Sequence, residues 1–530
     1  MLHENSLYER MLYVEIEFTD IVRKNLIKKK ITPEQINYDF IKLKNHSIKL
    51  FNKNKIDQSL KTIEVACNLM YNTNIKYVDD DLENLVVKIS KQIFKNEQVK
   101  MNVEYEDNKI VFYDYFALDN RGLTQQYLRG LMDLNYEILY ITYRSNDKSR
   151  ASNITKELDE YGKSKLYYIK NENNIRASME LYYTIKDFKS NKALIHTSPF
   201  DMIGLVTFAF LENKINRFLI NITDHAFWLG KSSADYFIEF RSYGFNLSEK
   251  HRGIEKKKLM MLPYYPIQYH KIEFQGFAFD SRSKKIIFSG GSLYKIYGSN
   301  FFFNTIKHIL DIHKDIIFLY AGNGDAKPLN NLIKRNGFQN RFFYINERKD
   351  ITQIFKRIYL YLDTYPISGG LMAQYAVVNG KLPISFRKKE SSSKIENLFI
   401  NSNDIKFTFT DEKSYLEELD KLISDPKYLR SRELQLPKLL INEIEFSKEL
   451  NKCITEGKTK FTPDRVDIDI DSAEAIQTYL DLVNNYPTRY YGMFVKRCHL
   501  KLGILFPNYF IRGFFGKLLN KIRGAQLNGY

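Results

Sequence analysis

Residues 361–385 read YLDTYPISGGLMAQYAVVNGKLPIS, and this stretch decides the fold class. The apolar run 358–362 predicts a strand, Ser368–Gly370 predicts the start of a helix that stops at Asn379-Gly380, and 382–386 predicts the next strand. Glycines at a helix start let backbone N–H groups approach an anion, and the helix dipole adds positive charge there. The order strand, glycine turn, helix, strand predicts an α/β sheet that binds its ligand at the carboxyl ends of the strands. The alternative is a helix start that only packs.

Length and composition indicate a globular protein of more than one domain. The chain has 530 residues, 44% of them hydrophobic and 27% charged, which is too long for a single core. Its three cysteines, Cys67, Cys453 and Cys498, lie far apart, so neither a disulfide scaffold nor a cysteine-type zinc site is expected. The first 25 residues lack a continuous apolar core, so we expect no signal peptide and a cytoplasmic location.

The net charge and one apolar stretch bear on possible partners. The charge is +17, from 80 Lys and Arg against 63 Asp and Glu, which suits nucleic acid, anionic lipid or phosphorylated substrates. No nucleic-acid-binding motif accompanies these charges, and they are spread along the chain, so nucleic acid is not an expected partner. The apolar stretch 193–211 contains His196, Pro199 and Asp201, so it predicts a buried strand, loop and helix rather than a membrane span.

The chain then divides by its periodicity. Residues 1–105 look helical, and apolar residues at helical spacing in 56–71 and 80–94 predict a hairpin-like helix pair, an appendage to the rest. From residue 109 on, short apolar strands alternate with helical stretches, which implies βαβ units and a parallel sheet. The expected strands of this first alternation are 109–114, 137–142, 165–170, 193–196, 217–221 and 235–240.

A second alternation follows a connecting segment. Its expected strands are 284–289, 315–322, 341–345, 358–363, 382–386 and 405–409. We therefore predict two tandem Rossmann-like domains facing a cleft, the architecture called GT-B. The predicted parts are a helical N-terminal region (1–105), a first Rossmann-like domain (106–262), a connection (263–283), a second Rossmann-like domain (284–470) and C-terminal helices with a basic, aromatic tail (471–530).

Four segments carry a resemblance to a known family. They are IIFSGGSLYKIYGSN (286–300), Leu-Asp-Thr at 362–364 with the glycine helix start that follows, NERKDITQI (346–354) and TDHAFWLGKSSADYF (223–237). Over about residues 190–450 the chain resembles Leloir glycosyltransferases, most closely the O-GlcNAc transferase group and bacterial cytoplasmic relatives. The resemblance implies a GT-B enzyme that takes a UDP-sugar as co-substrate, without a cofactor.

The resemblance also implies that the second Rossmann-like domain (284–470) is the nucleotide-sugar-binding domain and that the first (106–262) is the acceptor-side domain. Lys295 matches the family lysine that holds the donor diphosphate, and a lysine just past a strand end suits that charge in a water-poor cleft. Where the family has His-Thr-Thr at the helix start, this chain has Gly-Leu-Met (370–372), and Tyr375 stands where the family has a ribose-binding carboxylate. The implied donor-binding residues are Gly290, Gly291, Lys295, Arg348, Thr364, Ser368, Gly369, Gly370 and Gln374.

Transfer of a sugar to a hydroxyl needs a base within hydrogen-bond reach of the acceptor. His225 follows a predicted strand of the first half, with Asp224 beside it to orient or replace it, and Asp119 is a further candidate. His196 and Asp201, at the end of the preceding predicted strand, are second choices for the base. Arg121 and His196 are also expected on the acceptor side, although Asn120 beside Arg121 suits a plain helix cap as well. No convincing Asp-x-Asp metal signature is seen, so we expect no metal site and a metal-independent reaction.

The tail mixes Phe, Leu and Ile with Lys and Arg and has no acidic residue from 490 to 530. This pattern suits an interfacial helix on an anionic membrane, or a final helix that crosses back onto the first domain. The sequence thus predicts a hexosyl- or N-acetylhexosaminyltransferase in the cytoplasm, with the inner face of the cell membrane as a candidate location. Its acceptor would be a surface-glycan precursor, as in polysaccharide biosynthesis, or a protein. The alternative is a catalytically silent GT-B protein that binds the acceptor for an active partner, which the missing donor-contacting side chains favour.

Overall fold

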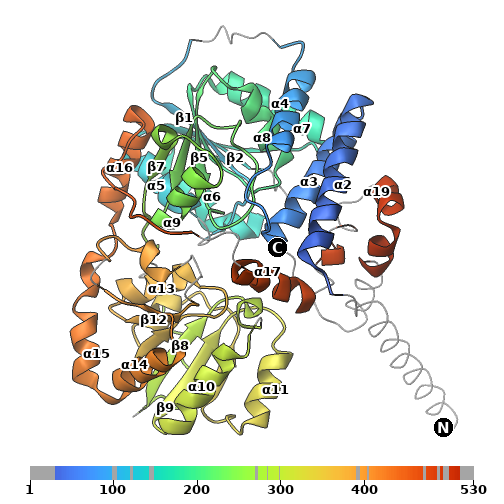
Figure 1. Cartoon of the computed structure of the whole chain (residues 1–530). Helices are drawn as coiled ribbons and strands as arrows, with labels where there is room; N and C mark the ends of the chain where they lie inside the picture. The colour runs from blue at the N-terminus through green and yellow to red at the C-terminus, as the bar shows by residue number, and fades with distance from the viewer. Residues whose placement is uncertain are drawn as a thin grey trace, which may run out of the picture. The chain divides into compact units, whose positions relative to one another are not determined.

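The computed structural model places the chain in two compact units, residues 76–475 and a smaller unit made of 1–75 with 476–530 (Figure 1). Each unit is described below by itself. The residues that the structure describes are 30–97, 104–119, 123–142, 148–268, 272–282, 284–297, 299–388, 394–402, 405–468, 473–485, 490–492, 494 and 500–513.

The smaller unit joins the two ends of the chain. Helix α2 (Pro33–Asn52) begins at Thr32, whose hydroxyl accepts the N–H of Gln35, and it packs against α3 (Ile56–Thr73). The C-terminal segment, which includes α17 (Ala473–Asn485) and α19 (Leu500–Leu505), also contacts α2. The Lys42 ammonium donates to the Leu505 carbonyl at 2.8 Å, and the Tyr490 hydroxyl donates to the buried Asp39 carboxylate at 2.8 Å.

The larger unit contains two parallel sheets. The first has the strand order β3-β2-β1-β4-β5-β6-β7, and every neighbouring pair is parallel. The order reverses between β1 and β4, as in a doubly wound sheet. The strands are β1 (Lys109–Asp114), β2 (Glu137–Thr142), β3 (Ser164–Tyr168), β4 (Lys192–His196), β5 (Asn216–Asn221), β6 (Tyr236–Glu239) and β7 (Leu259–Met261).

The second sheet repeats this plan with the order β10-β9-β8-β11-β12-β13, again parallel throughout. Its order reverses between β8 and β11. The strands are β8 (Lys285–Gly290), β9 (Ile316–Ala321), β10 (Phe342–Ile345), β11 (Leu360–Leu362), β12 (Pro383–Phe386) and β13 (Thr408–Phe409). The α/β class, the two tandem Rossmann-like domains and the helices at the N-terminus are therefore confirmed.

Helices connect the strands in both halves, because a parallel crossover needs a segment that returns to the starting edge. Those of the first half are α4 (Asp80–Ile93), α5 (Thr124–Asp133), α6 (Ser152–Tyr161), α7 (Asn174–Phe188), α8 (Met202–Phe210) and α9 (Ser242–Lys250). Those of the second half and the segment after it are α10 (Phe301–Ile312), α11 (Lys327–Arg335), α12 (Ile351–Phe355), α13 (Gly370–Val378), α14 (Glu412–Ser424), α15 (Pro426–Glu433) and α16 (Glu443–Glu456).

Helix α16 packs against α5 of the first half, so α16 crosses back onto that half. Gly130 of α5 permits this contact, since a Cβ there would lie 2.8 Å from Leu450 of α16. Arg129 and Glu443 add an ion pair of 3.0 Å between the same two helices. The described part of the tail instead packs within the smaller unit, where the Arg512 guanidinium donates to the Tyr491 hydroxyl at 2.9 Å.

Two sequence expectations need correction. The predicted pair of 56–71 and 80–94 does not form, because α3 packs on α2 whereas α4 packs on α8 in the larger unit. Buried Glu83 of α4 accepts the N–H of Gly230 at 2.7 Å, which fixes α4 to the loop after β5. The short strand β7 was missed, since Leu259–Met261 has no period-two pattern to read.

The stretch 193–211 forms β4, a loop and α8, as predicted. Among the helices that the structure describes, none is long and apolar enough to cross a membrane.

Candidate functional site

Each sheet reverses its strand order at one place, and ligands of such sheets bind at the carboxyl ends of the strands beside that place. In the second sheet these ends are Gly290 of β8 and Asp363, which directly follows β11. In the first sheet they are Asp114 of β1 and His196 of β4. We call these two places, which lie at the carboxyl ends of central strands and not at the outermost strands, the second edge and the first edge.

The centre of the second edge is the buried carboxylate of Asp363. It accepts hydrogen bonds from the Ser368 hydroxyl at 2.8 Å, the Gly369 N–H at 2.9 Å and the Ser385 hydroxyl at 3.0 Å. The buried Arg387 guanidinium, at the end of β12, donates to the same carboxylate at 2.6 Å. These bonds hold the loop before α13 in one conformation, and they leave the Asp363 charge fully compensated.

Lys295 lies beside this loop, in the 3-10 turn η3 (Leu293–Ile296) that follows β8. Its ammonium donates to the Ser368 carbonyl at 3.0 Å, and its own carbonyl accepts the Ile367 N–H at 3.3 Å. Burial lowers the pKa of the Lys295 ammonium, and the nearby Asp363 partly offsets this effect. Within the described part of the chain this ammonium makes one hydrogen bond, so two of its three donors remain for a ligand.

The start of α13 supplies further donors at the second edge. The N–H of Gly369 is used by Asp363, whereas those of Gly370 and Leu371 meet no hydrogen-bond acceptor within the described part of the chain. Such N–H groups in the first turn carry the positive end of the helix dipole. The Thr364 hydroxyl is not a comparable donor, because it already donates to the Ile367 carbonyl at 2.6 Å.

The glycines after β8 allow backbones to approach closely. Gly291 has φ of +143°, a conformation that side chains disfavour, and its carbonyl accepts the Tyr320 hydroxyl at 2.9 Å. A Cβ at Gly322 would lie 1.9 Å from the Gly291 carbonyl oxygen, and one at Gly290 would lie 2.8 Å from Met372 of α13. These three glycines therefore allow β8, β9 and the start of α13 to pack closely, which is a structural role independent of any ligand.

Two residues expected at the donor are bound by the protein instead. Arg348 forms an ion pair with buried Asp350, at 2.7 Å between Nε and the carboxylate. Gln374 is fully buried, and its amide donates to the Leu398 carbonyl at 3.3 Å. Arg348 and Gln374 are thus each held by contacts within the protein.

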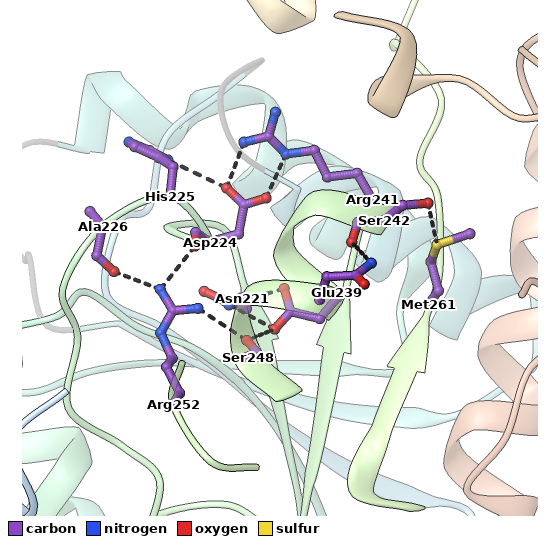
Figure 2. A network of polar contacts seen from close by, with 11 residues as sticks. Asn221, Asp224, His225, Ala226, Glu239, Arg241, Ser242, Ser248, Arg252 and Met261 are labelled. Carbon is purple, nitrogen blue, oxygen red and sulfur yellow. Dashed lines mark hydrogen bonds and ion pairs between the residues drawn. The ribbon is translucent and has the colours of Figure 1, made fainter. Parts of the chain in front are cut away.

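At the first half, the loop after β5 forms a buried network of charges (Figure 2). The Arg241 guanidinium donates to both oxygens of Asp224, at 2.5 and 2.8 Å. Burial alone would raise the pKa of Asp224, but Arg241 outweighs it and holds that pKa well below its usual range. A carboxylate so bound is a poor proton acceptor, so Asp224 does not suit the predicted role of replacing His225 as base. His225 lies 3.4 Å from it, with its side chain 43% exposed.

The same network includes a second buried carboxyl, Glu239 at the end of β6 (Figure 2). It accepts the Asn221 amide at 2.9 Å and the Ser248 hydroxyl at 2.6 Å, and Ser248 in turn accepts Arg252 at 3.0 Å. Burial raises the pKa of Glu239 to about 7, although the charge of Arg252 opposes this shift. A Cβ at Gly244 would lie 2.5 Å from Glu239, so only glycine lets α9 pack over this carboxyl.

The first edge holds a buried histidine–carboxylate pair. Nδ1 of His196 lies 2.9 Å from one oxygen of Asp114, and the other oxygen accepts the hydroxyls of Thr124 at 2.9 Å and Tyr140 at 2.7 Å. His196 and Asp114 are both fully buried. The prediction that His196 ends a strand is confirmed, whereas its immediate access to an acceptor is not seen in this structure.

The remaining predicted residues lie nearby in the sequence. Asp119 accepts the N–H groups of Asn153 and Ile154 at 2.8 and 3.0 Å and thereby caps the first turn of α6, a structural use that competes with catalysis. Arg121 lies outside the described residues. Within the described ranges, no cluster of three or more His, Cys, Asp or Glu side chains is arranged to hold a metal ion.

The sequence reading missed the partners that make these sites. Asp363 was quoted only as part of a motif, and Arg387, Arg241 and Asp114 were not singled out. A charged residue at the end of a buried strand was the available signal, as in LPISFR for Arg387 and KIVFYD for Asp114.

Comparison with solved structures finds proteins of similar architecture at low identity. An O-GlcNAc transferase of Thermobaculum terrenum has 11% identity and a TM-score of 0.47, with 86% of this chain and 81% of that chain covered. HepE of Anabaena, solved in complex with UDP and glucose, has 11% identity and a TM-score of 0.48, with 66% and 99% covered. The UDP-GlcNAc 2-epimerase of Neisseria meningitidis, bound to UDP-GlcNAc, has 13% identity and a TM-score of 0.47, with 66% and 100% covered.

No protein-family model matches the sequence, and no curated protein matches it either. Proteins described as glycosyltransferases, the class that the sequence resembles, are among the similar solved structures. At these identities and TM-scores, the assignment of the fold rests on the strand orders of the two sheets described above.

Proposed function

We propose that this protein is a glycosyltransferase that uses a nucleotide-diphospho-sugar, most plausibly a UDP-sugar, and binds the donor diphosphate at the second edge. One observation carries the proposal: the Lys295 ammonium and the unpaired N–H groups of Gly370 and Leu371 belong to one loop-and-helix unit. Lysine and a helix start are both ordinary binders of phosphate oxygens. The place is also where doubly wound sheets bind nucleotides.

The chemistry follows from this arrangement. When the bond between the sugar and the diphosphate breaks, negative charge develops on the departing nucleoside diphosphate. Preorganised cations and N–H dipoles stabilise such charge without reorganising. Lys295 is held by Ser368, and the loop is held by Asp363, so both donors are in place before the substrate arrives. In this proposal UDP-sugar is a co-substrate, and neither a metal nor a cofactor takes part.

A catalytically silent protein that binds the acceptor for an active partner is the second candidate. Two differences from the glycosyltransferase family at the donor site favour this candidate. Leu371 and Met372 offer no hydroxyl or imidazole to phosphate. Arg348 and Gln374 are held by contacts within the protein. The enzyme is favoured by the half-buried Lys295 ammonium, which lies beside the start of α13 and donates to the Ser368 carbonyl with one of its three donors.

The remaining expectations are finer proposals. The acceptor would be a surface-glycan precursor or a protein, and the transferred sugar a hexose or an N-acetylhexosamine. We keep the proposal of a cytoplasmic protein with peripheral attachment to an anionic membrane through the basic tail. It is supported by seven Lys and Arg and no acidic residue in 490–530.

Titration calorimetry of the full chain with UDP, GDP, CMP and a panel of UDP-sugars tests the proposal. Binding of UDP with release of UDP from one UDP-sugar supports the enzyme. Binding without any release, even with candidate glycan acceptors present, supports the silent protein. Absence of nucleotide binding across the panel would remove both the donor site and the proposed function.

A further inference from the structure

The first edge holds a polar pair that donor binding does not use. Asp114 and His196 are register partners on β1 and β4, the two strands between which the first sheet reverses its order. A reversal of this kind creates the crevice in which such sheets bind ligands. The pair is therefore the first-half counterpart of the Gly290 and Asp363 position in the second half.

The hydrogen bonds fix which nitrogen of His196 carries its proton. Burial alone would raise the pKa of Asp114, but the hydrogen bonds that this carboxyl accepts from His196, Tyr140 and Thr124 contribute to lowering that pKa. Asp114 is then an ionised carboxylate that only accepts, and it also takes the Phe116 N–H at 3.0 Å. Nδ1 of His196, 2.9 Å from this carboxylate, must be the donor. In the neutral ring Nε2 is then unprotonated, with its lone pair free.

Nε2 of His196 has no hydrogen-bond partner within the described part of the chain, although the residue is fully buried. A buried acceptor left without a donor is destabilising. What this atom lacks is an O–H or N–H donor. An acceptor hydroxyl supplies such a donor.

We propose that His196 is the base of the transfer reaction and that Asp114 is its positioning residue; this inference rests on the glycosyltransferase proposed above. The acceptor hydroxyl oxygen attacks the anomeric carbon of the donor sugar and forms the new C–O bond. The bond between that carbon and the diphosphate oxygen breaks, and UDP leaves with the electron pair. The hydroxyl proton moves to Nε2, which gives an imidazolium whose charge Asp114 balances.

The turn after β1 covers the histidine. The Tyr115 N–H donates to the His196 carbonyl at 2.9 Å, and the partly buried Phe116 ring lies with its centroid 4.9 Å from that of His196. Ala117 has φ of +44°, a backbone conformation that costs energy for a residue with a Cβ.

His225, the base expected from the sequence, is placed less favourably. It follows β5, one strand further from the reversal point, and its side chain is 43% exposed. Its neighbour Asp224 is already bound by both donors of Arg241, so it orients the imidazole only through a 3.4 Å contact. His225 thus serves as the matched control for His196.

The first test measures UDP release from the UDP-sugar that the wild-type chain binds, with water or glycan as acceptor. His196→Asn keeps an N–H for Asp114 but removes the base, so it should bind UDP as the wild type does and release it at least about 100-fold more slowly. If His225 is the base instead, the matched variant His225→Ala loses the rate and His196→Asn keeps it, which overturns the inference. His313→Asn, at a histidine of the second half that lies 2.8 Å from Asp420, should release UDP at the wild-type rate. A His196→Asn protein that releases UDP at the wild-type rate overturns the inference but leaves the proposed function standing, since donor binding is scored separately.

The second test needs no turnover. With ¹⁵N-labelled histidine, the His196 signal, assigned by its loss in His196→Asn, should show a protonated Nδ1 and an unprotonated Nε2. Asp114→Asn, whose amide donates to Nδ1, should move the proton to Nε2 and remove activity, while Asp119→Asn should leave the His196 signal unchanged. A wild-type ring protonated at Nε2 at neutral pH contradicts the inference. If the wild-type chain binds no nucleotide at all, the proposed function fails instead, and the base with it.

Discussion

The two halves of the larger unit have the same sheet plan but treat their charges differently. At the second edge, Asp363 is neutralised by Arg387 and by hydrogen bonds, and the Lys295 ammonium and two N–H groups are left with donors to spare. In the first half, the charges close on one another: Arg241 binds Asp224, and Arg252 lies beside Glu239 and Ser248 (Figure 2). The second half therefore has positively charged donors that can bind a ligand, whereas the charged side chains named in the first half pair with one another.

This difference teaches where an anion and where a neutral hydroxyl would bind. An anion needs uncompensated donors, which the second edge has. In the first half, Nε2 of buried His196 is an acceptor atom without a hydrogen-bond partner among the described residues, which suits a hydroxyl. Fold similarity between the halves thus does not imply similarity of ligand, because the ligand is chosen by the groups at each edge.

The largest effect is expected from breaking the buried ion pair of Arg241 and Asp224. Arg241→Met leaves the Asp224 carboxylate buried and unpaired, which should lower the stability of the first half by about 3–5 kcal/mol. Trp228, the only tryptophan of the chain, packs 4.8 Å from Arg252, so its fluorescence during urea unfolding reports this half. Adding Asp224→Asn should recover part of the loss, because the unpaired charge is gone. An Arg241→Met protein as stable as the wild type would contradict a stabilising role of this ion pair.

The next effect is expected at the open edge. Lys295→Ala should weaken UDP binding by about 1.5–3 kcal/mol, as for a hydrogen bond to a charged group, with little change in stability. Titration calorimetry measures the affinity, and the exposed Lys334→Ala on α11 is the matched control. Equal UDP affinity in a folded Lys295→Ala protein would remove the diphosphate assignment.

Glu239 should make the free energy of unfolding depend on pH. Its pKa is raised from 4.5 to about 7 in the folded protein, so between these values the folded state holds a proton that the unfolded state has released. The free energy of unfolding should therefore fall by about 2 kcal/mol as the pH rises from 5 to 8. Glu239→Gln should remove this part of the slope in Trp228 fluorescence. Parallel pH profiles for the two proteins would show that Glu239 is ionised in both states.

The smallest effect on either edge is expected from the tail. Removing residues 514–530 should leave UDP affinity unchanged but reduce binding to anionic vesicles, since Lys517, Lys521 and Arg523 each contribute about 1 kcal/mol near such a surface. Flotation with phosphatidylglycerol vesicles, against neutral vesicles, measures it. Unchanged flotation after the truncation would locate the attachment elsewhere. A longer deletion from residue 500 should instead destabilise the smaller unit, because Lys42 loses the Leu505 carbonyl.

Much of the fold could be predicted, because each element has a local cause. The run 109–114 is buried over five of its six residues and forms β1 at the predicted bounds, and the glycines at 369–370 begin α13 as expected. The failures were non-local. Helix α4 has the same amphipathic pattern as α3, yet it packs on α8, and nothing in its own periodicity distinguishes the two partners.

The sequence by itself determined the α/β class, the number of sheets and the position of Lys295 beside a glycine helix start, since periodicity and turn chemistry act over a few residues. Only the tertiary structure decided which charges neutralise each other. Asp114 and His196 are 82 residues apart, and Asp363 and Arg387 are 24 apart, yet each pair meets because strand order brings their strand ends together. Burial then removes water as the competing partner, which makes those few contacts decisive for which side chains remain free to bind and react.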